Sequence, residues 1–121
     1  MSLTFSGVVL DARDPAALAD FWAQALGWSG RGDGPRGEVV LQPREGETVY
    51  GPPSLVLQPV PEGKAVKNRV HLDFAAADQD AEVARLEALG ARRVDVGQGA
   101  DVTFVVLADV EGNEFCVLRE D

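Results

Sequence analysis

Cysteine, histidine and long apolar runs are almost missing from this chain. Its 121 residues include one cysteine, Cys116, and one histidine, His71. A single cysteine cannot form a disulfide within the chain, which agrees with a reducing compartment. No stretch approaches the roughly 20 apolar residues that span a bilayer, and no basic segment at the N-terminus leads into a secretory apolar core. We therefore expect a cytoplasmic protein without a membrane partner.

Basic residues are also few, with 11 against 20 acidic residues and a formal charge of −9. The electrostatic field of a protein with this net negative charge repels phosphate backbones, so nucleic acid is not an expected partner. The acidic surface either keeps the protein in solution or attracts a cationic ligand, and both interpretations stay open. The length and the hydrophobic content of 45% predict one globular domain with a real core.

Two segments of the chain share one pattern. Asp11 to Gly27 and Asp73 to Gly90 each run from the end of an apolar strand, through a helix capped by aspartate, to the letters "ALG". Such a repeat predicts two similar modules, at about residues 4–60 and 69–121, whose sheets curve around a shared cleft.

The first half begins with a short apolar strand, Phe5 to Asp11. Asp14 at the N-cap and Pro15 in the first turn open a helix that Gly27 ends. Its apolar stripe consists of Leu18, Phe21, Trp22, Ala25 and Leu26.

The rest of the first half contains several glycines. The segment Ser29 to Gly37 is so rich in glycine that it predicts a turn or mobile loop. A strand follows at Glu38 to Gln42, residues 43–53 form a second connection, and the last strand is Ser54 to Val60. A short polar link then leads to the second half.

The second half repeats this order. A strand at Arg69 to Ala75 precedes a helix that Asp78 caps and Gly90 ends, with Val83, Leu86 and Leu89 facing inward. Three more strands follow at Arg92 to Val96, Val102 to Ala108 and Glu114 to Arg119, with a tight turn at Asp109 to Asn113. We therefore expect an α+β fold of two βαβββ modules with curved mixed sheets.

Three sequence motifs carry a family resemblance. The helix ending "ADFWAQALGW", the strand start "HLDF" and the segment "LADVEGNEFCVL" resemble the vicinal oxygen chelate superfamily. This superfamily includes glyoxalase I, bleomycin-resistance proteins and extradiol dioxygenases, and the chain looks most like its small bacterial glyoxalase-like branch. The resemblance implies the fold and a homodimer, but it does not specify the chemistry because this fold carries many activities.

The same resemblance implies four possible metal-ligand positions around the cleft. They correspond here to Gly7, Gln58, His71 and Cys116, and only His71 matches the usual donor. An iron site of two histidines and a carboxylate cannot be formed with one histidine. We therefore expect no metal cofactor. If a metal is present, we expect His71, Gln58 and Cys116 as ligands, joined by Glu114 or Asp73, with zinc favoured by the thiolate and nickel, iron or manganese as alternatives.

His71 is the candidate catalytic residue, as a general base or a hydrogen-bonding anchor for a ligand. Asp73, two residues along the strand, has its Cβ about 6.5–7 Å away, close enough to share a ligand but too far to guarantee a contact. Cys116 and Glu114 share one face of the last strand, where Cys116 either packs as a small apolar residue or reacts. We predict a pocket lined by Gln58, His71, Asp73, Phe104, Glu114 and Cys116.

Aromatic residues add a further expectation. Trp28, Tyr50 and Phe104 lie at positions that either rim a cleft or cap the core, and aromatic rims suit planar or cationic ligands.

Three functions remain open. The first is a small-molecule binder of the glyoxalase and bleomycin-resistance type, with a degenerate or absent metal site and a cationic or aromatic ligand. The second is a metal-dependent lyase, isomerase or dioxygenase, similar to lactoylglutathione lyase or to the dioxygenases, that uses His71 and non-standard ligands. The third is a partner domain with a vestigial cleft. Whether the protein is an enzyme is left open.

Overall fold

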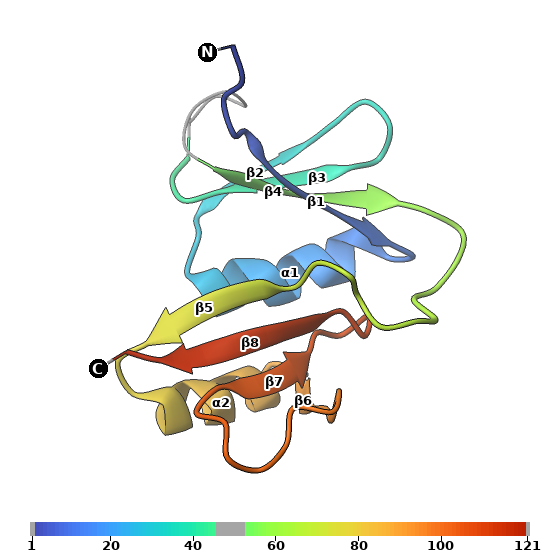
Figure 1. Ribbon diagram of the computed structural model, residues 1–121. Helices are drawn as coiled ribbons and strands as arrows, with labels where there is room; N and C mark the ends of the chain where they lie inside the picture. Colours follow the sequence, from blue (N-terminus) through green and yellow to red (C-terminus); the bar gives the residue numbers. More distant parts are fainter. Residues whose placement is uncertain (1, 46–52, 121) are drawn as a thin grey trace. The chain divides into compact units, whose positions relative to one another are not determined.

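The computed structural model describes residues 2–45 and 53–120. The chain divides into two compact units, Met1–Gly63 and Lys64–Asp121. Each unit contains one helix and one four-stranded mixed sheet (Figure 1). The expected α+β fold of two βαβββ modules is confirmed. Within the described residues, neither helix is both long and apolar enough to cross a membrane.

The first unit contains β1 (Gly7–Ala12), α1 (Pro15–Leu26), β2 (Gly30–Asp33), β3 (Val39–Gln42) and β4 (Ser54–Pro59). The strand order is β1-β4-β3-β2, and only the β1–β4 pair is parallel. Helix α1 packs against this sheet, on β4, β3 and β1 (Figure 1). The parallel pair is possible because α1 and the two following strands provide the long crossover that it requires.

Local sequence signals define α1 as predicted. The Asp14 carboxylate accepts a hydrogen bond from the Ala17 N–H at 3.1 Å, so one unpaired donor of the first turn is satisfied. Gly27 ends the helix with a φ of 67°, a left-handed conformation that glycine adopts without steric cost. Of the predicted stripe, Leu18, Phe21 and Trp22 are buried. Ala25 and Leu26 are half-buried.

The glycine-rich segment after α1 corrects a prediction. Composition predicts a loop from Ser29 to Gly37, but residues 30–33 form strand β2 and pair antiparallel with β3. A side chain at Gly30 would overlap the carbonyl oxygen of Arg44, so glycine permits this close approach of two chains. The backbone N–H and C=O groups of this segment form hydrogen bonds with β3, and the amino-acid composition of the segment gives no indication of that partner. The second predicted connection, 43–53, lies partly outside the described residues.

The second unit contains β5 (Leu72–Ala76), α2 (Gln79–Ala88), β6 (Arg92–Arg93), β7 (Val105–Ala108) and β8 (Glu114–Arg119). The order is β5-β8-β7-β6, with β5 and β8 parallel. Asp78 caps α2, Val83 and Leu86 are buried, and Leu89 is half-buried at the end of the helix. The strand β8 has the predicted bounds.

Three strands of the second unit are shorter than predicted. β5 begins at Leu72 rather than Arg69, β6 ends at Arg93 rather than Val96, and β7 begins at Val105 rather than Val102. Apolar residues alone predict longer strands, whereas a strand extends only as far as its partner continues to pair. His71 therefore lies immediately before β5, and Phe104 immediately before β7.

Candidate functional site

The second unit has a pocket of about 210 Å³. It brings together four of the predicted site residues, His71, Phe104, Glu114 and Cys116. The remaining lining comes from the segment before β5, from the loop after β6 and from β7, and consists of Lys67, Asn68, Val96, Gly97, Gln98 and Val106. Segments far apart in the sequence therefore converge on β8, the strand that supplies Glu114 and Cys116.

Cys116 occupies the centre of the sheet face beside this pocket. It pairs in register with Asp73 on β5 and with Val106 on β7, so the three side chains point to the same face. Cys116 is only 5% exposed. Burial raises the pKa of the Cys116 thiol, as do the charge of Asp73 and a hydrogen bond to it, and the charge of Lys67 only partly opposes this. The thiol is therefore protonated at neutral pH and donates its proton to Asp73.

His71 joins this group through Asp73. Its Nε2 atom lies 3.6 Å from Oδ1 of Asp73, so the contact that strand spacing alone could not guarantee is made by the side chains. One donor atom each from His71, Asp73 and Cys116 lies within 4.8 Å of the others. The imidazole and the carboxylate are about half exposed, whereas the thiol is buried.

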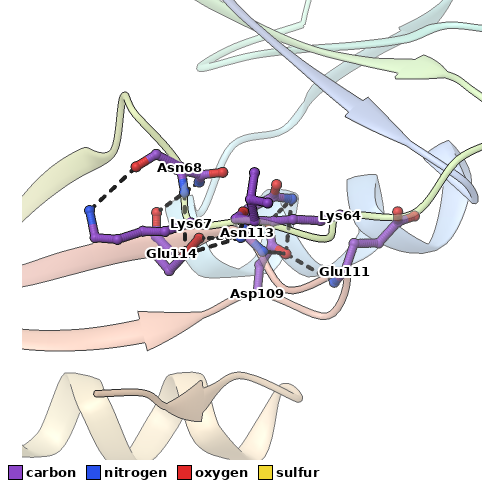
Figure 2. A network of polar contacts seen from close by, with 8 residues as sticks. Lys64, Lys67, Asn68, Asp109, Glu111, Asn113 and Glu114 are labelled. Atoms are coloured by element: carbon purple, nitrogen blue, oxygen red, sulfur yellow. Dashed lines mark hydrogen bonds and ion pairs between the residues drawn. The ribbon is translucent and has the colours of Figure 1, made fainter. Parts of the chain in front are cut away.

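A largely buried ion pair includes Glu114, one of the residues that line the pocket. Lys64 Nζ lies 2.7 Å from Oε2 of Glu114 and donates a hydrogen bond to Oε1 at 3.0 Å. The backbone N–H of Asn68 donates to the same Oε1 at 3.3 Å (Figure 2). The two charged side chains are only 17% and 11% exposed. Glu114 is therefore charged and paired, and it does not present an open carboxylate.

The pKa of Glu114 reflects this pairing. Burial alone would raise the pKa of Glu114, but the hydrogen bond from Lys64, backbone N–H donors of Glu114 and Asn68, and the charge of Lys64 together lower it. Neither Lys64 nor Asn68 is predicted from the sequence. Both belong to a segment with the composition of a polar link, and no local pattern indicates that a lysine there reaches a glutamate 50 positions away.

The turn before β8 positions both Glu114 and Cys116. The carboxylate of Asp109 is fully buried and accepts hydrogen bonds from the backbone N–H groups of Glu111 and Asn113 at 2.9 and 3.0 Å. The side-chain amide of Asn113 donates to both of its oxygens (Figure 2). The tight turn predicted at Asp109 to Asn113 is confirmed, and a buried carboxylate holds it together.

Two of the four ligand positions that the family resemblance implies, Gly7 and Gln58, lie in the first unit. Gln58 lies on β4 with an exposed side chain, opposite Asp11 in the parallel pair. Gly7 pairs with Ser54, and a Cβ atom at Gly7 would overlap both the carbonyl oxygen and the hydroxyl of Ser54. The absence of a side chain at Gly7 is therefore a packing requirement of the β1–β4 pair.

We expect Gly7→Ala to lower the free energy of unfolding by about 1–3 kcal/mol, because added atoms force packed strands apart. Urea denaturation measures the change. Gly32→Ala is the matched control, since a Cβ at this strand glycine meets nothing within 4 Å, and its effect should stay within about 0.5 kcal/mol. Equal losses in the two variants would show that crowding at Ser54 is not the cause.

A larger hollow of about 780 Å³ lies over β2, β3 and β4 of the first unit. Its charged lining residues are Arg31, Asp33, Glu38 and Glu45. None of the predicted pocket residues lines it, and Arg31 is paired with Asp20 at 2.7 Å. Of the predicted rim aromatics in this half, Trp28 is half-buried and Tyr50 lies outside the described residues.

Comparisons with known proteins agree with this fold. Residues 7–118 match the model of the glyoxalase-like domain. The chain is similar in structure to the fosfomycin resistance protein FosX from Listeria monocytogenes complexed with Mn(II) and sulfate, with 12% identity, a TM-score of 0.74, and coverage of 100% of this chain and 93% of that one. A search of curated protein sequences found no match.

Two further solved structures are similar along nearly their whole length. A glyoxalase/bleomycin resistance protein from Albidiferax ferrireducens shares 20% identity at a TM-score of 0.63, covering 97% of this chain and 98% of that one. TnmS3, an antibiotic-binding protein from a Streptomyces species, shares 20% identity at a TM-score of 0.61, covering 100% and 99%. At such identities the likeness concerns the fold.

Proposed function

Because the chain belongs to the glyoxalase-like domain family, we propose that it binds a small organic molecule with an aromatic part in the pocket of the second unit. The observation that carries this proposal is the lining itself. Half-buried Phe104 and apolar Val96 and Val106 line the pocket together with the polar groups of Asn68 and Glu114. An apolar surface with a few placed polar groups is the usual composition of a small-molecule site.

The charges around the pocket bear on the choice of ligand. The net charge of −9 favours a cation in the surrounding field. Within the pocket, however, the negative charge of Glu114 is paired with Lys64, and Lys67 adds a positive charge to the lining. We therefore favour contact with the aromatic ring over attraction of a cation as the main source of affinity. The predicted participation of Gln58, in the other unit, stays a prediction.

The loop after β6, which supplies Val96, Gly97 and Gln98 to the pocket lining, is held in a defined conformation by its own hydrogen bonds. The side chain of Gln98 accepts a hydrogen bond from the Val96 N–H at 2.8 Å and donates to the Val94 carbonyl at 3.3 Å. Gly97 in the same loop has a φ of 90°, which glycine adopts without strain. A loop closed on itself in this way loses less conformational entropy when a ligand binds.

We expect Phe104→Ala to weaken the binding of aromatic ligands about tenfold, because an aromatic contact contributes about 0.5–1.5 kcal/mol beyond its buried area. A library of planar aromatic fragments, screened by ligand-observed NMR against the chelator-treated protein, supplies the probes. Phe5→Ala is the matched control, since Phe5 is an exposed phenylalanine of the other unit. Fragments that bind both variants as tightly as the native chain would refute this assignment.

A second candidate function is a metal-dependent reaction of the lyase, isomerase or dioxygenase type. The group of His71, Asp73 and Cys116 favours it, because imidazole, carboxylate and thiolate are all metal ligands. These three residues would hold the ion. A bound divalent cation would act as a Lewis acid toward adjacent oxygens of a substrate. Iron held by two histidines does not fit a chain with one histidine.

We also propose an oligomeric state and a cellular compartment for this protein. We expect a homodimer in the cytoplasm, because its look-alikes are often dimeric and its single cysteine agrees with a reducing compartment. Light scattering coupled to size-exclusion chromatography tests the oligomeric state.

A further inference from the structure

We propose that the ligand of the pocket in the second unit is an aromatic carboxylate, and that the ammonium group of Lys67 binds its carboxylate. The aromatic ring is held as in the proposed function, on which this assignment rests. The charges of the residues that line the pocket, together with its volume, lead to this class of ligand.

Lys67 carries a positive charge without an ion-pair partner among residues 2–45 and 53–120. Its ammonium donates one hydrogen bond there, to the Asn68 carbonyl at 3.4 Å (Figure 2). The charge of Glu114, which also lines the pocket, is balanced by Lys64 at 2.7 Å. An ammonium has three donors, so Lys67 can donate hydrogen bonds to an anionic group in the pocket.

The electrostatic effect of Lys67 extends to the buried part of the pocket lining. Burial raises the pKa of the Cys116 thiol, as do the charge of Asp73 and a hydrogen bond to it, whereas the charge of Lys67 acts in the opposite direction. A positive charge that stabilises a thiolate at the pocket also stabilises the anionic group of a ligand there. Asp73 is not one of the lining residues, and its carboxylate lies 3.6 Å from the imidazole of His71.

The volume of the pocket limits the ligand to a small molecule. Sites for drug-sized ligands usually measure about 300–1,000 Å³, whereas this pocket measures about 210 Å³. A molecule that contacts Phe104 in so small a space lies within reach of Lys67, because the ammonium is carried on a flexible four-carbon stem. A single ring with a carboxylate substituent can therefore contact the apolar lining and accept a charge-assisted hydrogen bond from Lys67.

The net charge of −9 opposes the binding of any anion and so limits the charge that the ligand carries. Exposed charges more than about 8 Å apart are largely screened at physiological ionic strength, so Lys67 acts on a ligand in the pocket more strongly than distant acidic residues do. A carboxylate carries one negative charge, whereas a phosphate group carries about 1.5–2 at neutral pH. The smaller charge is repelled less, which favours a carboxylate.

Three fragments of one shape test the charge of the ligand, since benzoate is an anion, benzamide is neutral and benzamidine is a cation. Ligand-observed NMR measures their dissociation constants for the chelator-treated full chain. We expect benzoate to bind about tenfold more tightly than benzamide, because hydrogen bonds to charged groups are stronger than neutral ones. Benzamidine should bind most weakly, and added salt should reduce the advantage of benzoate.

Variants of Lys67 test the residue itself. Lys67→Met removes the ammonium and keeps a long side chain, so it should weaken benzoate binding about tenfold and leave benzamide binding unchanged. Lys67→Arg should retain the preference for benzoate. Arg69→Met is the matched control, since Arg69 is an exposed cation of the same segment but not one of the lining residues, and the preference for benzoate should persist in it.

Each outcome separates this assignment from the proposed function. Benzamide or benzamidine bound as tightly as benzoate would overturn the assignment of a carboxylate, as would a preference for benzoate that persists in Lys67→Met. The aromatic site still stands in those cases if Phe104→Ala weakens the binding of benzamide. If none of the three fragments binds the native chain, the aromatic site and the carboxylate assignment are both wrong.

Discussion

Asp109→Ala is expected to lower the free energy of unfolding by about 3–5 kcal/mol, a larger loss than we expect for Gly7→Ala or Lys64→Ala. The carboxylate is completely buried and satisfies the backbone N–H groups of Glu111 and Asn113 as well as the Asn113 amide. Alanine leaves these donors without an acceptor, and each unsatisfied buried group costs about 1–3 kcal/mol. Urea denaturation followed by circular dichroism measures the loss.

Two further variants make the Asp109 prediction specific. Asp101→Ala removes an exposed carboxylate from a loop of the same unit and should change stability by no more than about 0.5 kcal/mol. Asp109→Asn keeps one acceptor oxygen but turns an N–H₂ group toward the amide of Asn113, so we expect an intermediate loss. If Asp109→Ala were as stable as Asp101→Ala, the hydrogen bonds of the turn would not contribute to stability.

The turn also matters for the candidate site. It joins β7 to β8, and Glu114 is the residue that follows Asn113. A turn that loosens at Asp109 would release the start of β8, the strand that presents Glu114 and Cys116 to the pocket. We therefore interpret the buried aspartate as a structural support for the site and not as one of its reacting groups.

Lys64→Ala is expected to lower the free energy of unfolding by about 2–3 kcal/mol at neutral pH. Removing one partner of a fully buried ion pair costs about 3–5 kcal/mol because the other charge stays buried and unpaired. The lysine and glutamate side chains are 17% and 11% exposed, so part of that cost is relieved by water. The matched control is Lys67→Ala, because among the described residues the amine of this neighbouring lysine donates one hydrogen bond, to the Asn68 carbonyl at 3.4 Å, and forms no ion pair.

The pH dependence of this loss has a definite sign. The pKa of Glu114 is lowered in the folded protein, despite the opposing effect of burial, by the hydrogen bond and charge of Lys64 and by backbone donors. Its contribution to stability is therefore complete above the unfolded pKa of about 4.3 and is lost as the pH falls through the lower folded pKa. The difference between native chain and Lys64→Ala should shrink across that acidic window. A difference independent of pH would contradict the role of the ion pair.

The ion pair has a consequence for the pocket. Residues 64–71 contain no helix or strand, yet Lys64 and Asn68 attach this segment to Glu114 on β8. His71 and the lining residues Lys67 and Asn68 belong to the same segment. Loss of Lys64 should therefore also reduce the affinity for ligands of the pocket, because the wall that carries His71 becomes less ordered.

Local signals in the sequence predicted much of the fold. The caps at Asp14 and Asp78, the turn at Asp109 and the bounds of β8 agree with the structure, and glycines of positive φ, Gly27 and Gly90, stand at the ends of both helices as predicted. These features depend on neighbours within a few residues, where side-chain chemistry and backbone conformation are directly coupled. The error at β2 has the opposite origin, since a glycine-rich strand depends on the pairing partner β3 and not on its own composition.

For the candidate site, too, some features could be predicted from the sequence and others required the three-dimensional structure. Residue types alone established that the chain has one imidazole and one thiol, and that Glu114 and Cys116 share a strand face. The contact of Asp73 with both His71 and Cys116, and the pairing of Glu114 with Lys64, came only from the three-dimensional arrangement. Strand register and the path of an irregular segment are set by the summed packing of the whole unit, and no single stretch of sequence contains that information.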